Sequence, residues 1–214
     1  MPALLAVLVV AAALLPPGRQ AAVAAWTRLG DAVAVARAAD ARERTVALYA
    51  FRYGIPHDLA DAIERAAVRE GIATELAFRL VRVESAFRED AVSSAGALGL
   101  TQLMPATAAE LSPGITREGI LERETNLRLG FRYLRWLLRV YGGDTAEALT
   151  AYNRGPGTVA RIRSAGGDPA NGYAELVQGA RGASPVGRPR EDGARSPAAL
   201  PPPHELPPAR LRER

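Results

Sequence analysis

The middle of the chain carries apolar residues at helical spacing, and no stretch alternates apolar and polar residues for long enough to predict a strand. One stripe predicts a helix with a single buried face, formed by Ile72, Leu76, Leu80, Val83 and Phe87. A second stripe, over residues 126–141, predicts the longest helix, which Gly142 and Gly143 end. The pattern predicts a mainly α domain from about residue 56 to about residue 180.

Capping residues and breakers set the expected helix ends. Asp58 can cap a helix that carries Leu59 and Ile63, and Pro105 can begin a short helix that ends at Leu111. Asp144 and Glu147 are spaced as in a capping box and predict another helix start. Gly130 lies on the apolar stripe of the longest helix, where glycine lowers helix stability, so we expect a neighbour packed closely against it.

The N-terminal segment differs from this domain. Residues 3–15 form an almost unbroken apolar run, too short to span a bilayer comfortably and typical of the core of a signal peptide. Ala22-Val23-Ala24 resembles a signal peptidase site, but no basic residue precedes the run, so an uncleaved anchor stays an alternative. We interpret 1–25 as signal peptide or N-terminal anchor of an exported protein, in the periplasm or cell envelope, and 26–55 as a helical lead-in.

The C-terminal segment, residues 181–214, is rich in proline and arginine and has no apolar periodicity. Such a composition cannot bury enough surface to offset chain entropy, so it predicts a disordered tail. The 214 residues thus accommodate one globular domain with extensions at both ends.

Composition excludes several classes of chemistry. The chain has no cysteine, which removes thiolate catalysis, disulfides and cysteine-bound metals, and its two histidines, His57 and His204, assemble neither a metal site nor a histidine-based triad. The formal net charge of +4 arises from acidic and basic residues that alternate along the chain, without a nucleic-acid-binding motif. We expect no metal, no cofactor and no nucleic-acid partner.

Glu84 lies at the edge of the first apolar stripe. Partial desolvation there would disfavour its charged form and raise its pKa, as a general acid near neutral pH requires. A glutamate that points outward, or pairs with Arg82 or Arg88, is the structural alternative and is common on helices.

The segments after Glu84 favour a ligand site. Small residues fill 91–97, and Gly96, Gly99 and Gln102 then suggest backbone close to a ligand, with an amide at hand. Downstream, Tyr152 precedes the turn Gly155-Pro156-Gly157. A carboxylic acid with amide, hydroxyl and phenol groups suits sugar chemistry better than acyl or phosphoryl transfer.

Four blocks of the sequence resemble, in order, the signatures of the soluble lytic transglycosylase (SLT) family: ESAF at 84–87, GALGLTQLMP at 96–105, NLRLGFRYL at 126–134 and AYNRGPG at 151–157. Each block alone is weak evidence, but four in order at fitting distances are specific. The resemblance covers roughly residues 59–159.

The resemblance implies a lysozyme-like, mainly α fold, with residues 56–180 as a catalytic domain that cleaves the β-1,4 bond between N-acetylmuramic acid and N-acetylglucosamine in peptidoglycan. It implies that Glu84 first protonates the glycosidic oxygen and then accepts the proton of the muramoyl C6 hydroxyl. That hydroxyl attacks C1 and leaves a 1,6-anhydro end, so no water and no second carboxylate are needed, unlike in two-carboxylate glycosidases. Glu89 and Asp90 lie at variable family positions and are interpreted as solvated surface acids.

The resemblance also implies substrate-binding residues, with two alternatives left open. Its matched positions place Ser93 near the substrate, with the neighbouring Ser94 as an alternative. They also place four residues along the sugar cleft: Gln102, Met104, Tyr152 and Asn153. Core packing is the alternative role for Met104 and Tyr152. Thr101 stands where the family usually has methionine, and its hydroxyl is expected near the cleft.

Two other functions remain open on the sequence. A goose-type lysozyme relative would hydrolyse the same bond with an activated water, and a non-catalytic module would bind the cell wall or help assemble an envelope complex. The expected partners are peptidoglycan glycan strands. Membrane anchoring through the N-terminus and cell-envelope protein partners are further candidates.

Overall fold

The computed structural model describes residues 17–179, with side chains from Trp26 onward, and divides the chain at Gly54 into two units. The first unit contains one long helix, α2 (Pro17–Tyr53), which ends at Gly54 with a positive φ of 63°. The alanine-rich sequence has high helix propensity, and the described part of this helix, which starts with the first described residue, includes most of the helical lead-in expected over 26–55. Residues 1–16 of the expected signal peptide or anchor, and the expected tail over 181–214, lie outside the described residues. Within the described part, no helix combines the length and apolarity needed to cross a bilayer.

The second unit begins at Ile55 and is a helical domain. Its first helix is α3 (His57–Glu70), which Gly71 ends in a left-handed conformation. The expectation that Asp58 caps this helix is wrong: Pro56 is the N-cap residue, and Asp58 lies inside the first turn. Its carboxylate instead accepts a hydrogen bond from Arg123, which is a stronger partner than a backbone amide because both groups are charged.

The helix that carries Glu84 is α4 (Thr74–Ser85), and its buried face differs from the predicted stripe. Ile72 precedes the helix, and Phe87 follows it with a positive φ of 63°. Leu80 is buried as expected, whereas the rest of the buried face consists of Ala77, Phe78, Val81 and Ser85. Ile72 is buried as predicted although it lies outside the helix, whereas Leu76 and Val83 lie inside it and are only partly buried. The prediction also extended one helical period across both ends of a twelve-residue helix. Glu84 nevertheless lies beside the buried Ser85, in the last turn.

Three further helices follow. The short helix α5 (Pro105–Leu111) begins at proline as predicted, and α6 (Arg117–Leu121) comes next. The longest helix of this domain, α7 (Arg123–Val140), begins three residues before the predicted start, because the carboxylate of Glu122 accepts hydrogen bonds from the backbone amides of Glu124 and Thr125.

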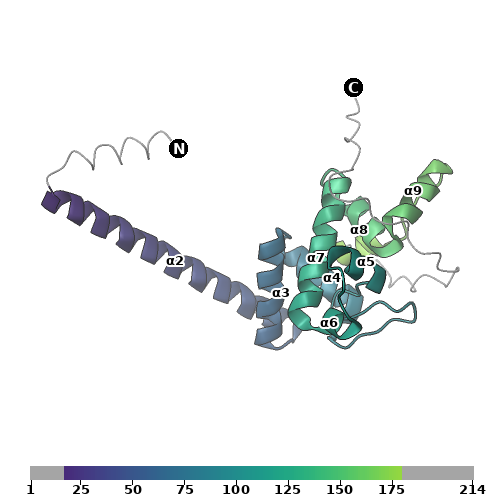
Figure 1. Ribbon diagram of the computed structural model, residues 1–214, viewed down its shortest axis with the longest axis horizontal. Helices are drawn as coiled ribbons and strands as arrows, with labels where there is room; N and C mark the ends of the chain where they lie inside the picture. Colours follow the sequence, from purple (N-terminus) through teal and green to yellow (C-terminus); the bar gives the residue numbers. More distant parts are fainter. Residues whose placement is uncertain (1–16, 180–214) are drawn as a thin grey trace, which may run out of the picture. The chain divides into compact units, whose positions relative to one another are not determined.

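The last three helices are α8 (Thr145–Arg154), α9 (Pro156–Ser164) and α10 (Tyr173–Gln178). The predicted cap of α8 is confirmed, since the Asp144 carboxylate accepts a hydrogen bond from the Glu147 amide at 3.0 Å. Within this domain α7 packs against both α3 and α8 (Figure 1). Helix α10 packs against α4 and α8. Residues far apart in the sequence therefore meet where α4, α8 and α10 come together.

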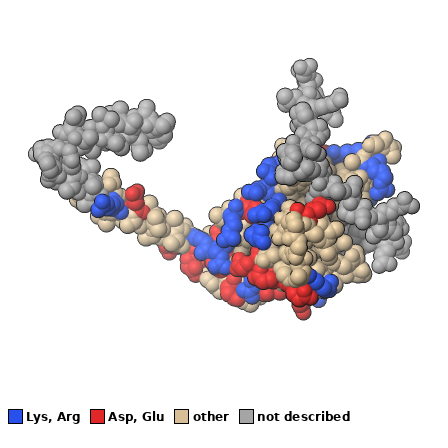
Figure 2. All heavy atoms as spheres, in the orientation of Figure 1, with Lys and Arg blue, Asp and Glu red and all other residues tan. Residues whose placement is uncertain are grey.

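The core of the domain is apolar and its surface carries both signs of charge. The described residues 55–179 contain isolated β-bridges but no strand, which confirms the mainly α prediction. One core cluster joins the loop before α5 to α6 and α7, and comprises Leu98, Leu103, Ala108, Ile120 and Leu129. On the face shown in Figure 2, arginine and acidic side chains lie side by side next to a broad uncharged area.

Candidate active site

Glu84 lies in the last turn of α4 and is partly buried. Its Oε1 accepts a hydrogen bond from the phenol of Tyr173, the first residue of α10. Because α10 packs against α4, this contact joins two segments separated by 89 positions. The carboxylate is thus held by a neutral donor at the end of a helix.

Tyr173 is suited to remain that neutral donor. Its side chain is buried, and burial raises the pKa of its phenol well above the usual value. The negative charge of Glu84, and the hydrogen bond to it, raise this pKa further. A phenol that keeps its proton can donate to the carboxylate of Glu84 and so stabilises the charged form of that group.

Tyr152, in the last turns of α8, is a second phenol near Glu84. Burial raises its pKa well above the ordinary value, and the charge of Glu84 contributes next. The hydroxyl donates a hydrogen bond to the carbonyl of Thr101 at 3.0 Å, and the ring packs against Tyr133 with centroids 5.3 Å apart. Tyr152 therefore packs in the domain and also lies within electrostatic reach of Glu84.

The loop between α4 and α5 is fixed by its own hydrogen bonds. Leu98 forms antiparallel bridges with both Val92 and Leu103. The side-chain amide nitrogen of Gln102 donates hydrogen bonds to the carbonyls of Ala91 and Gly99, at 3.1 and 2.9 Å. Gln102 also has a positive φ of 47°, an uncommon conformation for a residue with a side chain. The Gln102 amide thus shapes the loop that follows Glu84.

Two other predicted binding residues belong to the same loop. The hydroxyl of Ser93 accepts a hydrogen bond from the Ala97 amide at 2.9 Å, which closes a small turn, while Ser94 beside it is exposed. Met104 is the N-cap residue of α5 and is 40% exposed, so core packing does not account for it. An exposed methionine offers an apolar, adaptable contact surface.

Thr101 does not lie at the surface of a cleft, which corrects the sequence-based expectation. Its side chain is fully buried, and its hydroxyl donates to the Asn126 side-chain oxygen at 2.8 Å, as does its backbone amide. The Asn126 amide group in turn donates to the carbonyls of Leu98 and Ile120, each at 2.9 Å. Threonine at this position therefore joins the active-site loop to the start of α7.

The contact between Thr101 and Asn126 explains why two nearby positions are glycine. A Cβ on Gly99, which has a φ of +72°, would lie 2.4 Å from the Asn126 side chain, and one on Gly130 would lie 2.3 Å from the Thr101 hydroxyl. The expected close neighbour of Gly130 is thus confirmed as Thr101. Gly99 is required by internal packing, and the backbone approaches Asn126 there, whereas the sequence suggested approach to a ligand.

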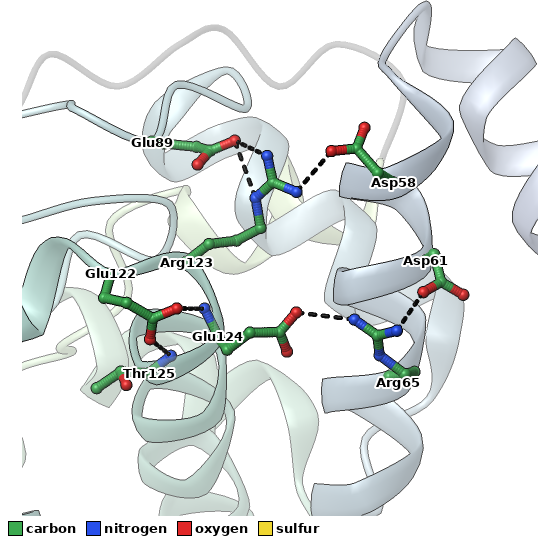
Figure 3. Close-up of polar contacts among 8 residues, drawn as sticks. All are labelled: Asp58, Asp61, Arg65, Glu89, Glu122, Arg123, Glu124 and Thr125. Atoms are coloured by element: carbon green, nitrogen blue, oxygen red, sulfur yellow. Dashed lines mark hydrogen bonds and ion pairs between the residues drawn. The ribbon is translucent and has the colours of Figure 1, made fainter.

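An arginine fixes the beginning of the same loop (Figure 3). Arg123, at the first position of α7, donates to Glu89 at 2.6 Å and to Asp58 at 2.8 Å. The charge-assisted bond from Arg123 holds the pKa of the Asp58 carboxyl below its usual value. Glu89 is therefore an ion-pair partner whose side chain is still 40% exposed, and Asp90 is exposed as predicted.

Asn153 follows Tyr152 and contacts the segment that leads into α10. Its side-chain oxygen accepts a hydrogen bond from the amide nitrogen of Asn171 at 2.8 Å. The candidate site residues thus come from α4, the following loop and α8, and Tyr173 and Asn171, which contact them, come from α10 and the segment before it. In the described residues no three His, Asp or Glu side chains gather in a way that could hold a metal ion.

The model of the transglycosylase SLT domain family matches residues 61–172, just over half of the 214 residues. The chain belongs to the SLT domain family. The matched range contains Glu84, the loop up to Met104, and Tyr152 with Asn153, so the four sequence blocks lie in the domain that their resemblance indicated.

Named relatives agree with this assignment. The soluble lytic murein transglycosylase of Escherichia coli (strain K12) is 34% identical over 105 residues, which cover 46% of this chain and 16% of that protein. The membrane-bound lytic murein transglycosylase C of Edwardsiella ictaluri is 34% identical over 122 residues, 50% of this chain and 34% of the relative. The alignment with this SLT chain therefore spans about a third or less of the length of these relatives.

A solved structure supports the fold. The complex of the 70-kDa soluble lytic transglycosylase with bulgecin A superimposes with a TM-score of 0.51 at 27% sequence identity. The superposition covers 64% of this chain and 26% of the other. The SLT chain thus shares the helical architecture of one part of a larger protein.

Tyr173 and Asn171 were not identified from the sequence. Tyr173 lies at the C-terminal edge of the domain, in a helix of only six residues. The available signal was the buried set of Tyr173, Ala174 and Val177, which begins a short apolar face directly after Asn171-Gly172. Periodicity over so few residues is ambiguous, and the contact with Glu84 is set only by tertiary packing.

We predict that Tyr173→Phe lowers kcat/KM and moves the alkaline limb of the pH–rate profile to higher pH. A hydrogen bond to a charged group contributes about 1.5–3 kcal/mol, so its loss should reduce activity about tenfold or more. Without the phenol donor, the carboxylate form of Glu84 loses a stabilising hydrogen bond, so the carboxyl should keep its proton to higher pH. Turbidity clearing of cell-wall suspensions from pH 4 to 9 measures both effects, and an unmoved alkaline limb would contradict the assigned contact.

Proposed function

We propose that this SLT chain is a peptidoglycan lytic transglycosylase that cleaves the β-1,4 bond between N-acetylmuramic acid and N-acetylglucosamine without water. The observation that carries the proposal is Glu84 at the end of α4, inside the range that matches the SLT family, with its carboxylate held by the phenol of Tyr173, which directly follows that range. The charge of Glu84 raises the pKa of two phenols, those of Tyr152 and Tyr173, which places both near its carboxylate.

The proposed reaction uses Glu84 twice. The protonated carboxyl first donates its proton to the glycosidic oxygen, the bond between C1 and that oxygen breaks, and the alcohol of the next sugar leaves. The resulting carboxylate then accepts the proton of the muramoyl C6 hydroxyl, whose oxygen attacks C1 and closes a 1,6-anhydro ring. The proton lost in the first step is recovered in the second, so the enzyme returns to its starting state.

Support for the two-step role comes from the surroundings of Glu84. Partial burial disfavours the carboxylate form of Glu84, while the hydrogen bond from Tyr173 favours it. A group that donates a proton and then accepts one must populate both its protonated and its charged form. We propose that the substrate contacts come from Ser93, Gln102, Met104, Tyr152 and Asn153. Met104 would supply an apolar surface, and the others polar groups beside the sugar.

The product of digestion tests the proposal. Purified protein is incubated with intact sacculi, and the released fragments are analysed by mass spectrometry. We expect anhydromuramoyl ends, which are one water molecule lighter than reducing ends. Only reducing muramic acid ends would instead identify a hydrolase of the goose-type lysozyme kind, and no released fragments would indicate a non-catalytic wall-binding module.

A cell-envelope setting follows from the proposed substrate. The relatives include one protein named soluble and one named membrane-bound, and both names contain murein, the polymer that the proposed reaction cleaves. We propose that the chain is exported to the periplasm or cell envelope, where glycan strands are its partner. Fractionation of cells that express a tagged full-length chain tests this, and it also separates a cleaved signal peptide from an uncleaved anchor by the mass of the mature protein.

A further inference from the structure

Two asparagines connect the end of α8 with the start of α10. Asn153 lies directly after Tyr152, and Asn171 lies two residues before Tyr173. Their side chains meet at 2.8 Å, with the Asn171 amide nitrogen donating to the Asn153 oxygen. Both side chains are partly buried, so the hydrogen bond is partly shielded from competing water.

Asn171 also shapes the turn that delivers Tyr173. Its side-chain oxygen accepts a hydrogen bond from the Tyr173 backbone amide at 3.3 Å, which forms an Asx turn. Gly172 between them adopts a left-handed conformation with a φ of +78°. The side-chain nitrogen of Asn171 therefore ties the turn to Asn153, and its side-chain oxygen fixes the backbone of Tyr173 at the start of α10.

A tether of this kind matters because α10 is short. Six residues do not form a stable helix alone, so the position of α10 depends on its contacts. At its other end, the Arg79 guanidinium of α4 donates a hydrogen bond to the carbonyl of Gln178. The Asn153–Asn171 contact is the tether closer to the phenol that reaches Glu84.

We propose that Asn171, held by Asn153, is a positioning residue that sets the Tyr173 phenol on Oε1 of Glu84. The inference rests on the proposed role of Glu84 as the proton carrier. It assigns Asn153 a part in holding α10 in addition to its proposed contact with substrate. Asn171 acts through Tyr173, so its replacement changes the proton transfer only while the phenol is present.

A double-mutant cycle tests this dependence. We expect Asn171→Ala to lower kcat/KM about threefold to tenfold and to move the alkaline limb of the pH–rate profile in the same direction as Tyr173→Phe. The double variant should match Tyr173→Phe within about twofold, because the second change has nothing left to misplace. The control is Asp168→Ala, which removes a turn bond of the same type, to the Ala170 amide, from the same loop. We expect it to leave the alkaline limb in place.

A readout without turnover separates this inference from the proposed function. Protein labelled with ¹³C at the glutamate carboxyl carbon is titrated by NMR, and the Glu84 signal is assigned by its loss in Glu84→Gln. We expect the Glu84 titration to move to higher pH in both Asn171→Ala and Tyr173→Phe. If it moves in the Phe variant alone, or if the two shifts add in the double variant, Asn171 does not position the phenol. If the titrations behave as expected but no wall fragments appear, the positioning stands and the proposed reaction fails.

Discussion

Glu84→Gln is expected to lower the rate of wall cleavage by about 10²- to 10⁴-fold, the usual contribution of a positioned general acid–base group. The amide has nearly the same shape as the carboxyl and can still accept a hydrogen bond from the Tyr173 phenol, so the fold and the contact between α4 and α10 should persist. It cannot donate a proton to the glycosidic oxygen or accept one from the C6 hydroxyl, and both proposed steps stop. Initial rates of turbidity loss from purified sacculi, with fragment release by chromatography, measure the effect.

Glu75→Gln is the matched control for this prediction. Glu75 lies in the first turn of the same helix, where its carboxylate pairs with Arg79 at 2.6 Å. A partly exposed pair of this kind stabilises a protein by about 1 kcal/mol or less. Arg79 can still donate its hydrogen bond to the Gln178 carbonyl in this variant, so activity should stay close to that of the unchanged chain. The Glu84→Gln variant should also still sediment with sacculi, because binding does not need the proton. Unchanged wall clearing by this variant would remove Glu84 from the role of acid.

Local sequence signals predicted several elements because their causes are local. Pro105 begins α5 and Asp144 caps α8, and each effect depends only on residues within one helical turn. The mainly α architecture followed from apolar spacing repeated over many turns. The close neighbour of Gly130 was predictable in kind, because a glycine on the apolar stripe of a helix needs a packing reason.

Features decided by tertiary contacts were not predictable. The buried face of α4 was misplaced because the helix ends at Ser85, where the following residues turn into the left-handed region. Asp58 could cap α3 as far as local sequence goes, yet Arg123, 65 positions away, binds its carboxylate. The contact between Glu84 and Tyr173 likewise depends on α10 packing against α4, which no pattern within either helix records.

The position of Thr101 shows how a family departure is accommodated. The family usually has methionine there, and the sequence alone suggested a hydroxyl at the cleft. In the structure the hydroxyl donates to Asn126, while the Thr101 carbonyl accepts a hydrogen bond from Tyr152. Thr101 therefore contacts both Asn126 of α7 and the Tyr152 phenol near Glu84. A change in the packing around Thr101 is expected to disturb the loop between α4 and α5.

Gly130→Ala tests this coupling and is expected to destabilise the domain strongly. The new Cβ would lie 2.3 Å from the Thr101 hydroxyl oxygen and 2.5 Å from its Cβ, closer than real contacts allow. Overpacking a core costs about 1–3 kcal/mol, and loss of the buried Thr101–Asn126 hydrogen bond adds about 1–3 kcal/mol. The higher helix propensity of alanine returns only about 1 kcal/mol. We expect a net loss of about 1–5 kcal/mol in the free energy of unfolding, measured by urea denaturation.

Gly157→Ala is the control, because Gly157 is a helical glycine of α9 whose added Cβ would meet no atom within 4 Å. There the lower entropy of the unfolded chain and the helix propensity of alanine should leave stability unchanged or raise it by up to about 1 kcal/mol. Because Thr101 also accepts the Tyr152 hydrogen bond, Gly130→Ala should lower wall cleavage even at temperatures where the protein stays folded, whereas Gly157→Ala should not lower the stability of the domain. A Gly130→Ala protein as stable as the unchanged chain would show that the loop around Thr101 can move away from α7, and the proposed coupling between that helix and the active site would be wrong.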